Sequence, residues 1–96
     1  MKYIQLKTEI PGPKARVMLE RRAAATPKGL AKSTEVVVEK AEDGLVWDID
    51  GNQLLDFAGG IGMINVGHRP EIVVNAIKNQ LDKYIHTCSL VTTFEP

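Results

Sequence analysis

Acidic and amide side chains gather at a predicted tight turn, where their spacing could support metal chemistry. Asp48, Asp50 and Asn52 alternate along the chain, like the first oxygen ligands of a calcium-binding EF-hand loop. That loop also requires Gly at its sixth position and Glu at its twelfth, where this sequence has Gln53 and Gly59. We therefore interpret the three residues as parts of a turn.

A glycine-rich apolar stretch follows, with glycines at positions 59, 60, 62 and 67. The run Gly60-Ile61-Gly62 begins like a dinucleotide-binding fingerprint, but Asn65 stands where the third glycine belongs. A phosphate-binding loop is excluded because no Gly-Lys-Ser/Thr sequence ends the stretch. The stretch is too apolar for a solvated loop and too glycine-rich for a stable helix or strand. We expect buried backbone that lies close to another part of the protein, a partner subunit or a ligand.

His68, His86 and Cys88 are the remaining candidates for a metal site or a nucleophile-base pair. Only His86 and Cys88 lie close together in the sequence, and two ligands are too few for a zinc module. A catalytic Cys-His pair stays possible, because its members can meet in space without being close in the sequence. A structural role is the better interpretation, with the histidines bonded to backbone groups near turns. Cys88 is the single cysteine, which suits a reducing compartment and favours the cytoplasm.

Composition narrows the possible partners. The 96 residues are 44% hydrophobic and 25% charged, and twelve basic residues balance twelve acidic ones, so we expect at most one small domain. This balance predicts no field that would attract nucleic acid or an anionic membrane. No apolar run approaches the roughly twenty residues of a membrane span, and no leader-like apolar region follows Met1-Lys2.

The elements that position these residues are two helices and a small sheet. Pro13 fits a first helical position, and residues 14–25 carry an apolar face that ends before Pro27. This face comprises Ala15, Met18, Leu19 and Ala23. The neighbouring pair Arg21-Arg22 is interpreted as solvated helix surface, because two basic residues do not make a binding patch.

Three strand candidates follow, at 36–41, 45–49 and 53–57. Glu42-Asp43-Gly44 and Asp50-Gly51-Asn52 link them and are typical of hairpin turns, so we expect an antiparallel three-stranded meander. A second helix begins at Pro70, and residues 86–93 are expected to be extended or loop structure. This helix has a stripe predicted to face a core, made of Val73, Ala76, Ile77, Leu81 and Tyr84. The predicted fold class is α+β.

Several segments, in this order, resemble one enzyme family. They are Ile10-Pro11-Gly12-Pro13, Leu19-Glu20-Arg21-Arg22, Trp47-Asp48-Ile49-Asp50-Gly51, Leu55-Asp56-Phe57-Ala58-Gly59-Gly60-Ile61-Gly62, Asn65-Val66-Gly67-His68 and His86-Thr87-Cys88. Together they resemble the N-terminal part of the class III pyridoxal-phosphate-dependent aminotransferases, most closely the 4-aminobutyrate branch. The resemblance implies that residues 1–96 are the N-terminal segment of a longer fold type I (α/β) enzyme, and the ending at Pro96 is interpreted as a cut.

The implied activity is transfer of an amino group from an ω-amino acid such as 4-aminobutyrate to 2-oxoglutarate, in a homodimer. In the family a lysine binds pyridoxal phosphate as a Schiff base, an aspartate pairs with the pyridine nitrogen and a glycine/serine segment holds the phosphate. All three would lie beyond this chain, whose eight lysines match none of them, so no catalytic or cofactor-binding residue is assigned here.

By the same resemblance, Ile61 and Gly60 are the expected substrate-binding residues, as a wall beside substrate and cofactor. Residues 86–91 are expected to approach the partner subunit's site. Two departures from the family pattern stand out. Gly67-His68-Arg69-Pro70 is one residue shorter than the usual Gly-His-x-His-Pro, and Ser89 replaces an aromatic residue that is frequent in relatives.

Two alternatives remain open at this point. The chain could be a free-standing α+β binding or oligomerisation module that uses the apolar glycine stretch as its interface. It could also be a truncated relative without catalysis. The fragment hypothesis predicts that the stripe and the region around Ile61 are exposed in the isolated chain, whereas a module predicts a cooperative fold.

Overall fold

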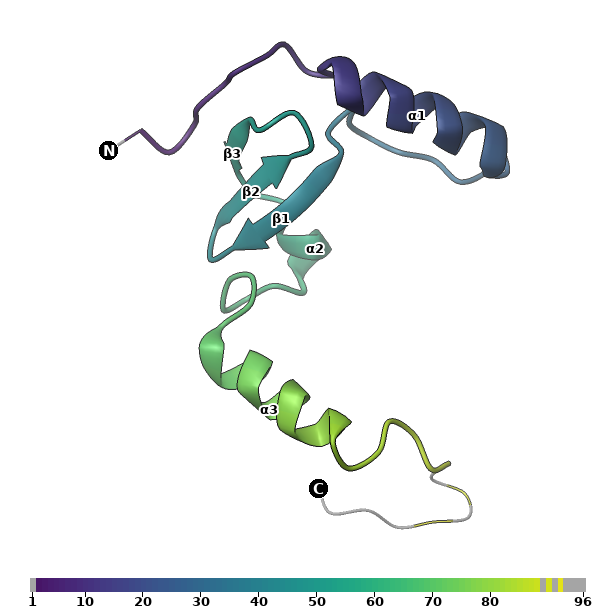
Figure 1. Cartoon of the computed structure of the whole chain (residues 1–96), viewed down its shortest axis with the longest axis vertical. Coiled ribbons are helices and arrows are strands. Elements are labelled where there is room, and N and C mark those ends of the chain that lie inside the picture. Colours follow the sequence, from purple (N-terminus) through teal and green to yellow (C-terminus); the bar gives the residue numbers. More distant parts are fainter. Residues whose placement is uncertain (1, 89, 91, 93–96) are drawn as a thin grey trace.

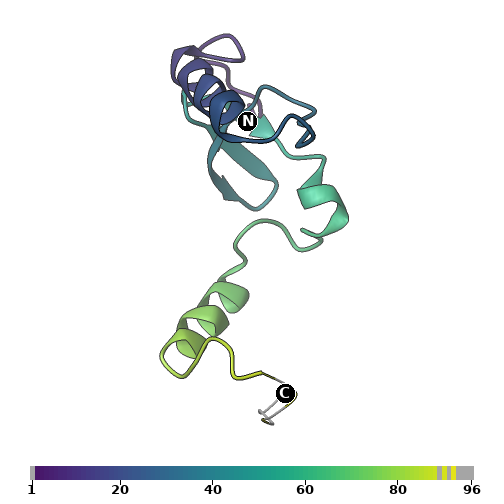
Figure 2. The same ribbon diagram turned by 90° about the vertical axis from the view of Figure 1, so that its right-hand side faces the viewer.

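The structure is a computed structural model that describes residues 2–88, 90 and 92. Its overall shape is elongated, with extents of 50 × 40 × 23 Å, and the two longer helices lie at opposite ends of the molecule in both views (Figures 1 and 2). The elements run in the order α1 (Pro13–Ala25), β1 (Val38–Glu42), β2 (Leu45–Asp48), β3 (Gln53–Leu55), α2 (Gly59–Gly62) and α3 (Glu71–Leu81). The predicted α+β class is confirmed.

The three strands form the predicted antiparallel meander, in the order β1-β2-β3. Val46 pairs with Leu54 across β2 and β3, and the register shifts between Val38 and Lys40 on β1. The ammonium group of Lys40 lies 4.5 Å from the ring centre of Trp47, which is a favourable cation–π distance.

Four predicted strand boundaries differ from the structure. β1 ends one residue later and β2 one residue earlier than predicted, and the other two boundaries differ by two residues. β1 begins at Val38 and not at residue 36, although the carbonyl of Val37 still accepts a bond from Ile49 N at 2.9 Å. β3 ends at Leu55 and not at residue 57, because the carboxylate of Asp56 accepts bonds from the backbone of Ala58 and Gly59. Such a side-chain bond to the following backbone starts a turn and ends the strand.

The N-terminal arm lies beside the sheet (Figure 1). The backbones of Gln5 and Gln53 exchange two hydrogen bonds of 2.9 and 2.8 Å, which makes an isolated antiparallel bridge to β3. The Gln53 side chain also donates to the carbonyl of Tyr3 at 2.8 Å. The arm is therefore bound to the sheet by backbone contacts.

α1 begins at Pro13 as predicted, but its apolar face is mostly uncovered. Ala15 is 1% exposed, whereas Met18 is 37% exposed and Ala23 is also exposed. Over the described residues, Ala15 is the only buried apolar side chain, and Asp48 and Asn52 are the buried polar ones. The interior of this chain is accordingly small and largely polar.

The second predicted helix forms as α3, but it begins at Glu71, one residue after Pro70, and ends at Leu81, before Tyr84 of the predicted stripe. The expectation that its stripe faces a core is wrong for this chain, since Val73, Ile77 and Leu81 are 44%, 55% and 59% exposed. No other element lies close enough to cover them (Figures 1 and 2). The amphipathic pattern formed the helix, but its apolar side lacks a partner within the described chain.

Residues 86–88, 90 and 92 lie outside helices and strands, as predicted; the rest of the predicted extended segment, including Ser89, lies outside the described residues. No helix in the described part of the chain is long and apolar enough to cross a membrane.

Candidate functional site

The predicted turn at residues 48–52 is a buried polar cluster. Asn52 is 0% and Asp48 is 1% exposed. One carboxylate oxygen of Asp48 accepts from the backbone N–H groups of Asp50 at 3.0 Å and Asn52 at 2.8 Å, and the other accepts from the Asn52 amide at 2.7 Å. The Asp48 carboxylate is therefore occupied by the turn itself.

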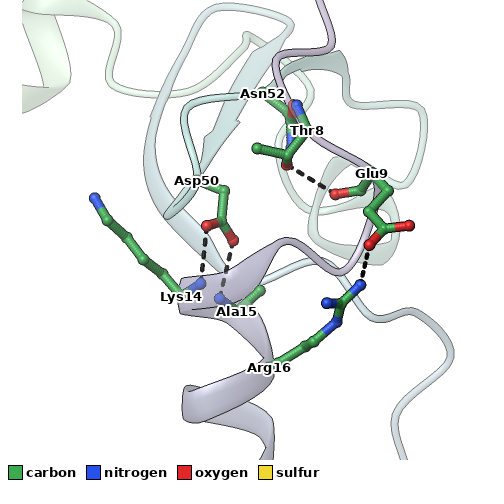
Figure 3. Close-up of polar contacts among 7 residues, drawn as sticks. All are labelled: Thr8, Glu9, Lys14, Ala15, Arg16, Asp50 and Asn52. Atoms are coloured by element: carbon green, nitrogen blue, oxygen red, sulfur yellow. Dashed lines mark hydrogen bonds and ion pairs between the residues drawn. The ribbon is translucent and has the colours of Figure 1, made fainter.

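Asn52 also attaches the N-terminal arm to this turn. Its side-chain oxygen accepts from the backbone N–H groups of Lys7 at 2.6 Å and Thr8 at 2.9 Å. Its amide donates to the hydroxyl of Thr8 at 2.9 Å. Figure 3 shows Asn52 and Thr8 close together, above the first turn of α1.

Asp50 holds the start of α1. Its two carboxylate oxygens accept from the backbone N–H groups of Lys14 and Ala15, each at 2.9 Å (Figure 3). Gly12, the residue just before the helix, offers no side chain to do this. Glu9 pairs with Arg16 nearby. The interpretation of Asp48, Asp50 and Asn52 as turn residues is confirmed, because hydrogen bonds to protein groups occupy their oxygens.

The glycine stretch contains the two predicted substrate-binding residues. It forms one short turn, α2, in which Gly59, Gly60, Ile61 and Gly62 have φ angles of 52°, 59°, 54° and 78°. A left-handed conformation is open to glycine but costs a β-branched residue about 1–2 kcal/mol. Ile61 is the residue that carries this strain.

Most of this stretch is exposed within the described chain, as the fragment hypothesis predicts for the isolated segment. Ile61 is 92% exposed and Gly60 is exposed, while Met63 and Val66 are 75% and 73% exposed. The apolar side chains therefore face outward, and contact with another surface would have to come from outside the described residues.

Asp56 and His68 close the base of this stretch, a pairing that the sequence analysis missed. The Asp56 carboxylate lies 2.6 Å from Nε2 of His68, and the two side chains are 14% and 21% exposed. The hydrogen bond to His68, followed by the backbone bond from Gly59, holds the pKa of Asp56 below its ordinary value. The only sequence signal was their position, one at each end of the glycine stretch.

Of the three candidate metal ligands or nucleophiles, one forms a structural contact and the other two are exposed to solvent. His68 pairs with a carboxylate through its ring, and its backbone, not its ring, makes the expected bonds to a turn, at Asp43. His86 and Cys88 are exposed. Across residues 2–88, 90 and 92, no group of three His, Cys, Asp or Glu side chains could hold a metal ion.

An open groove of ≈ 370 Å³ runs along one side of the sheet to Asp56 and His68. Its lining is mainly apolar and includes Val36, Val46, Leu54, Phe57 and Ala58. The connection that leads into α3 contains Arg69, which has a φ of 55°.

The described residues do not form a complete site for pyridoxal phosphate. A Schiff-base lysine needs its pKa lowered, usually by burial, yet all eight lysines of this chain are exposed. The groove is mainly apolar, and Asp56 already bonds His68 and the backbone.

Residues 28–96 match the family model described as Aminotransferase class-III. A 5-aminovalerate aminotransferase of Pseudomonas aeruginosa is 46% identical over 79 residues, covering 82% of this chain and 18% of that protein. A 4-aminobutyrate aminotransferase of Mycobacterium bovis is 41% identical over 91 residues, covering 95% of this chain and 20% of that protein. That of Escherichia coli K12 is 42% identical over 79 residues, covering 82% of this chain and 18% of that protein.

Solved aminotransferase structures superpose on this chain and show the same fold. An acetylornithine aminotransferase from Elizabethkingia anophelis superposes with a TM-score of 0.77 at 22% identity, covering 83% of this chain and 21% of that one. An ornithine aminotransferase from Toxoplasma gondii superposes with a TM-score of 0.75 at 23% identity, covering 94% of this chain and 20% of that one. The fold is that of a part of the fold type I pyridoxal-phosphate-dependent aminotransferases.

The chain belongs to the class III aminotransferase family. Its relatives within that family include enzymes named for 4-aminobutyrate and for 5-aminovalerate. The chain spans about a fifth of the length of these curated relatives.

Proposed function

We propose that this chain is the N-terminal segment of a pyridoxal-phosphate-dependent enzyme that transfers an amino group from an ω-amino acid to 2-oxoglutarate. The observation that carries the proposal is the match of residues 28–96 to the class III family, together with relatives named for ω-amino acids. The exposed α3 stripe supports a segment and not a self-contained domain, since a stable small domain buries such a face.

The cofactor would supply stabilisation of a carbanion at the reacting carbon, held by residues outside this chain. The role proposed for this chain is to shape the substrate space. Ile61 would present a branched apolar side chain to the amino donor, limiting its width and excluding water, while Gly60 would let the backbone approach closely. Their exposure here suits that role, because the side chain of Ile61 is free to meet another surface.

The activity is tested on the intact protein that contains this chain. With pyridoxal phosphate added, 4-aminobutyrate or 5-aminovalerate should convert 2-oxoglutarate to glutamate, and removal of the cofactor should abolish the product. Absence of glutamate with both donors, in a protein that binds the cofactor, would refute the proposed reaction.

The substrate wall is tested by Ile61→Ala. Loss of the branched side chain should raise KM for 4-aminobutyrate by about tenfold, because apolar groups fit the substrate less closely. A donor with a bulkier carbon chain should be affected less. Val66→Ala, in the same exposed stretch, is the matched control, and equal effects of both changes would argue against a specific role for Ile61.

The proposal includes a cytoplasmic homodimer in which residues 86–91 approach the partner's site. The exposure of the described residues 86–88 and 90 supports this, while positions 89 and 91 lie outside the described residues. Light scattering of the intact protein should give twice the subunit mass, and a monomer with full activity would rule out a shared site.

A further inference from the structure

Both ends of the loop formed by residues 57–67 are attached to the same hairpin turn between β1 and β2. Before the loop, Asp56 N donates to the carbonyl of Gly44 at 2.9 Å. After the loop, His68 N donates to the carbonyl of Asp43 at 2.7 Å, and Asp43 N donates back to His68 at 3.0 Å. The sheet therefore sets where the loop starts and where it ends.

Side chains then close this base. Asp56 Oδ2 bonds His68 Nε2 at 2.6 Å, while its Oδ1 accepts from Ala58 N at 3.0 Å and Gly59 N at 2.9 Å. One carboxylate thus fixes the first backbone groups of the loop and joins them to its far end. A side chain on Gly67 would place a Cβ 3.0 Å from Cα of Asp43, so the close approach at this end requires glycine.

Apolar packing does not hold the loop within the described chain. Phe57, Ile61, Met63 and Val66 are 93%, 92%, 75% and 73% exposed. A loop with so few packed side chains takes its position from its polar contacts. The Asp56–His68 pair is the side-chain contact that joins its two ends.

We propose that Asp56 and His68 are positioning residues that fix the 57–67 loop and thereby direct Ile61 toward the substrate space. The inference about substrate rests on the proposed function, whereas the inference about the loop stands on its contacts. Loss of either residue leaves both ends attached to the hairpin but removes the side-chain contact that joins them, so the loop samples more conformations. Loss of Asp56 also frees the backbone N–H groups of Ala58 and Gly59.

The test uses His68→Ala, Asp56→Ala, the double variant and the conservative His68→Gln in the intact protein. Limited proteolysis with a broad-specificity protease should cleave within residues 57–67 about fivefold faster in both single variants. KM for 4-aminobutyrate should rise by about tenfold, which is the loss expected for a hydrogen bond to a charged group. KM is the informative constant because it does not depend on the fraction of folded enzyme.

The double variant should cost no more than Asp56→Ala, because the ring of His68 acts only through its contact with Asp56. Gln can still donate to Asp56, so His68→Gln should restore most of the protection and of the KM, and it also serves if the alanine variant fails to fold. Asp82→Ala, an exposed carboxylate after α3, is the control and should change neither.

Wild-type cleavage rates and wild-type KM in His68→Ala would overturn the proposal, as would additive effects in the double variant. If the unmodified protein forms no glutamate, the proposed function fails, and the cleavage measurements still decide by themselves whether the pair holds the loop.

Discussion

Among the residues that the structure describes, Asn52 makes the largest number of side-chain hydrogen bonds. It is fully buried, its oxygen accepts two bonds from the N-terminal arm, and its amide donates to Thr8 and Asp48. A buried amide with both of its groups satisfied is specific in a way that an ion pair is not, since it donates and accepts at once.

Asn52→Asp should therefore be strongly destabilising despite its nearly equal size. It replaces the donor to Asp48 by a second carboxylate, and an uncompensated buried charge costs about 3 kcal/mol. The free energy of unfolding, measured with urea, should fall by about that amount at neutral pH. The loss should shrink as the pH falls toward about 4, because burial and the neighbouring Asp48 raise the pKa of the new carboxyl above its ordinary value and favour its protonation. Asn75→Asp on exposed α3 is the matched control, and an equal loss there would contradict this account.

The contribution of Asp56 to the free energy of unfolding depends on pH in a direction that its contacts determine. Its pKa in the folded chain is lowered, chiefly by the bond from His68 and then by the backbone bond from Gly59. The unfolded state therefore binds the proton more tightly, so the stabilisation is present above the unfolded pKa of about 4 and is lost as pH falls through the lower folded value.

The difference in unfolding free energy between the unmodified protein and Asp56→Asn should thus be largest near neutral pH and shrink in acid. The side chain is partly solvated, so the difference is modest. A difference that grows toward low pH would show that the pair does not stabilise the ionised carboxylate.

At the scale of elements, α1 depends on a carboxylate from the β2–β3 turn. A Cβ at Gly12 would lie 2.4 Å from Cγ of Asp50, so the glycine leaves room for the capping group. Gly12→Ala and Asp50→Ala should each cost about 1 kcal/mol, the usual value of a lost helix cap. Since both remove the same cap, the double variant should cost about as much as one change.

Gly29→Ala is the control for this cycle, because nothing lies within 4 Å of its added Cβ. It should leave the stability unchanged or slightly higher, since it only restricts the unfolded chain. Urea unfolding of the unmodified protein and the four variants measures all of these values. Additive losses at Gly12 and Asp50 would mean that Asp50 does not act as the cap.

For the whole molecule, the uncovered side of α3 makes the isolated chain and the intact protein respond in opposite ways. Ile77→Lys places a charge on a stripe that is exposed here. In the isolated 96-residue chain it should reduce the binding of an environment-sensitive dye and improve solubility. In the intact protein we expect other parts of the enzyme to cover this stripe. There, Ile77→Lys should lower the free energy of unfolding by about 3 kcal/mol or prevent folding.

Asn79→Lys, on the polar side of the same helix, adds the same charge and should be neutral in both settings. If the isolated chain instead unfolds in one sharp thermal transition and binds no dye, the free-standing module becomes the better description. Dye fluorescence and calorimetry on both proteins distinguish these results.

The sequence by itself determined the elements. Pro13 and Pro70 indicated where two helices start. The helical spacing of Val73, Ile77 and Leu81 predicted that the second helix continues through α3. Two hairpin turns predicted the meander. These signals act within a few residues of the chain, so they survive without any knowledge of tertiary contacts. The ordered set of motifs also identified the family.

Only the tertiary structure decided which residues meet. Asp50 caps a helix start 36 residues earlier in the chain, Asn52 holds an arm 45 residues away, and Asp56 reaches His68 across the whole glycine loop. Such pairings depend on how the loops close, which no local pattern encodes. The same reason applies to the glycine stretch, because an apolar composition predicts a need for cover, whereas the surrounding surfaces decide whether cover is present.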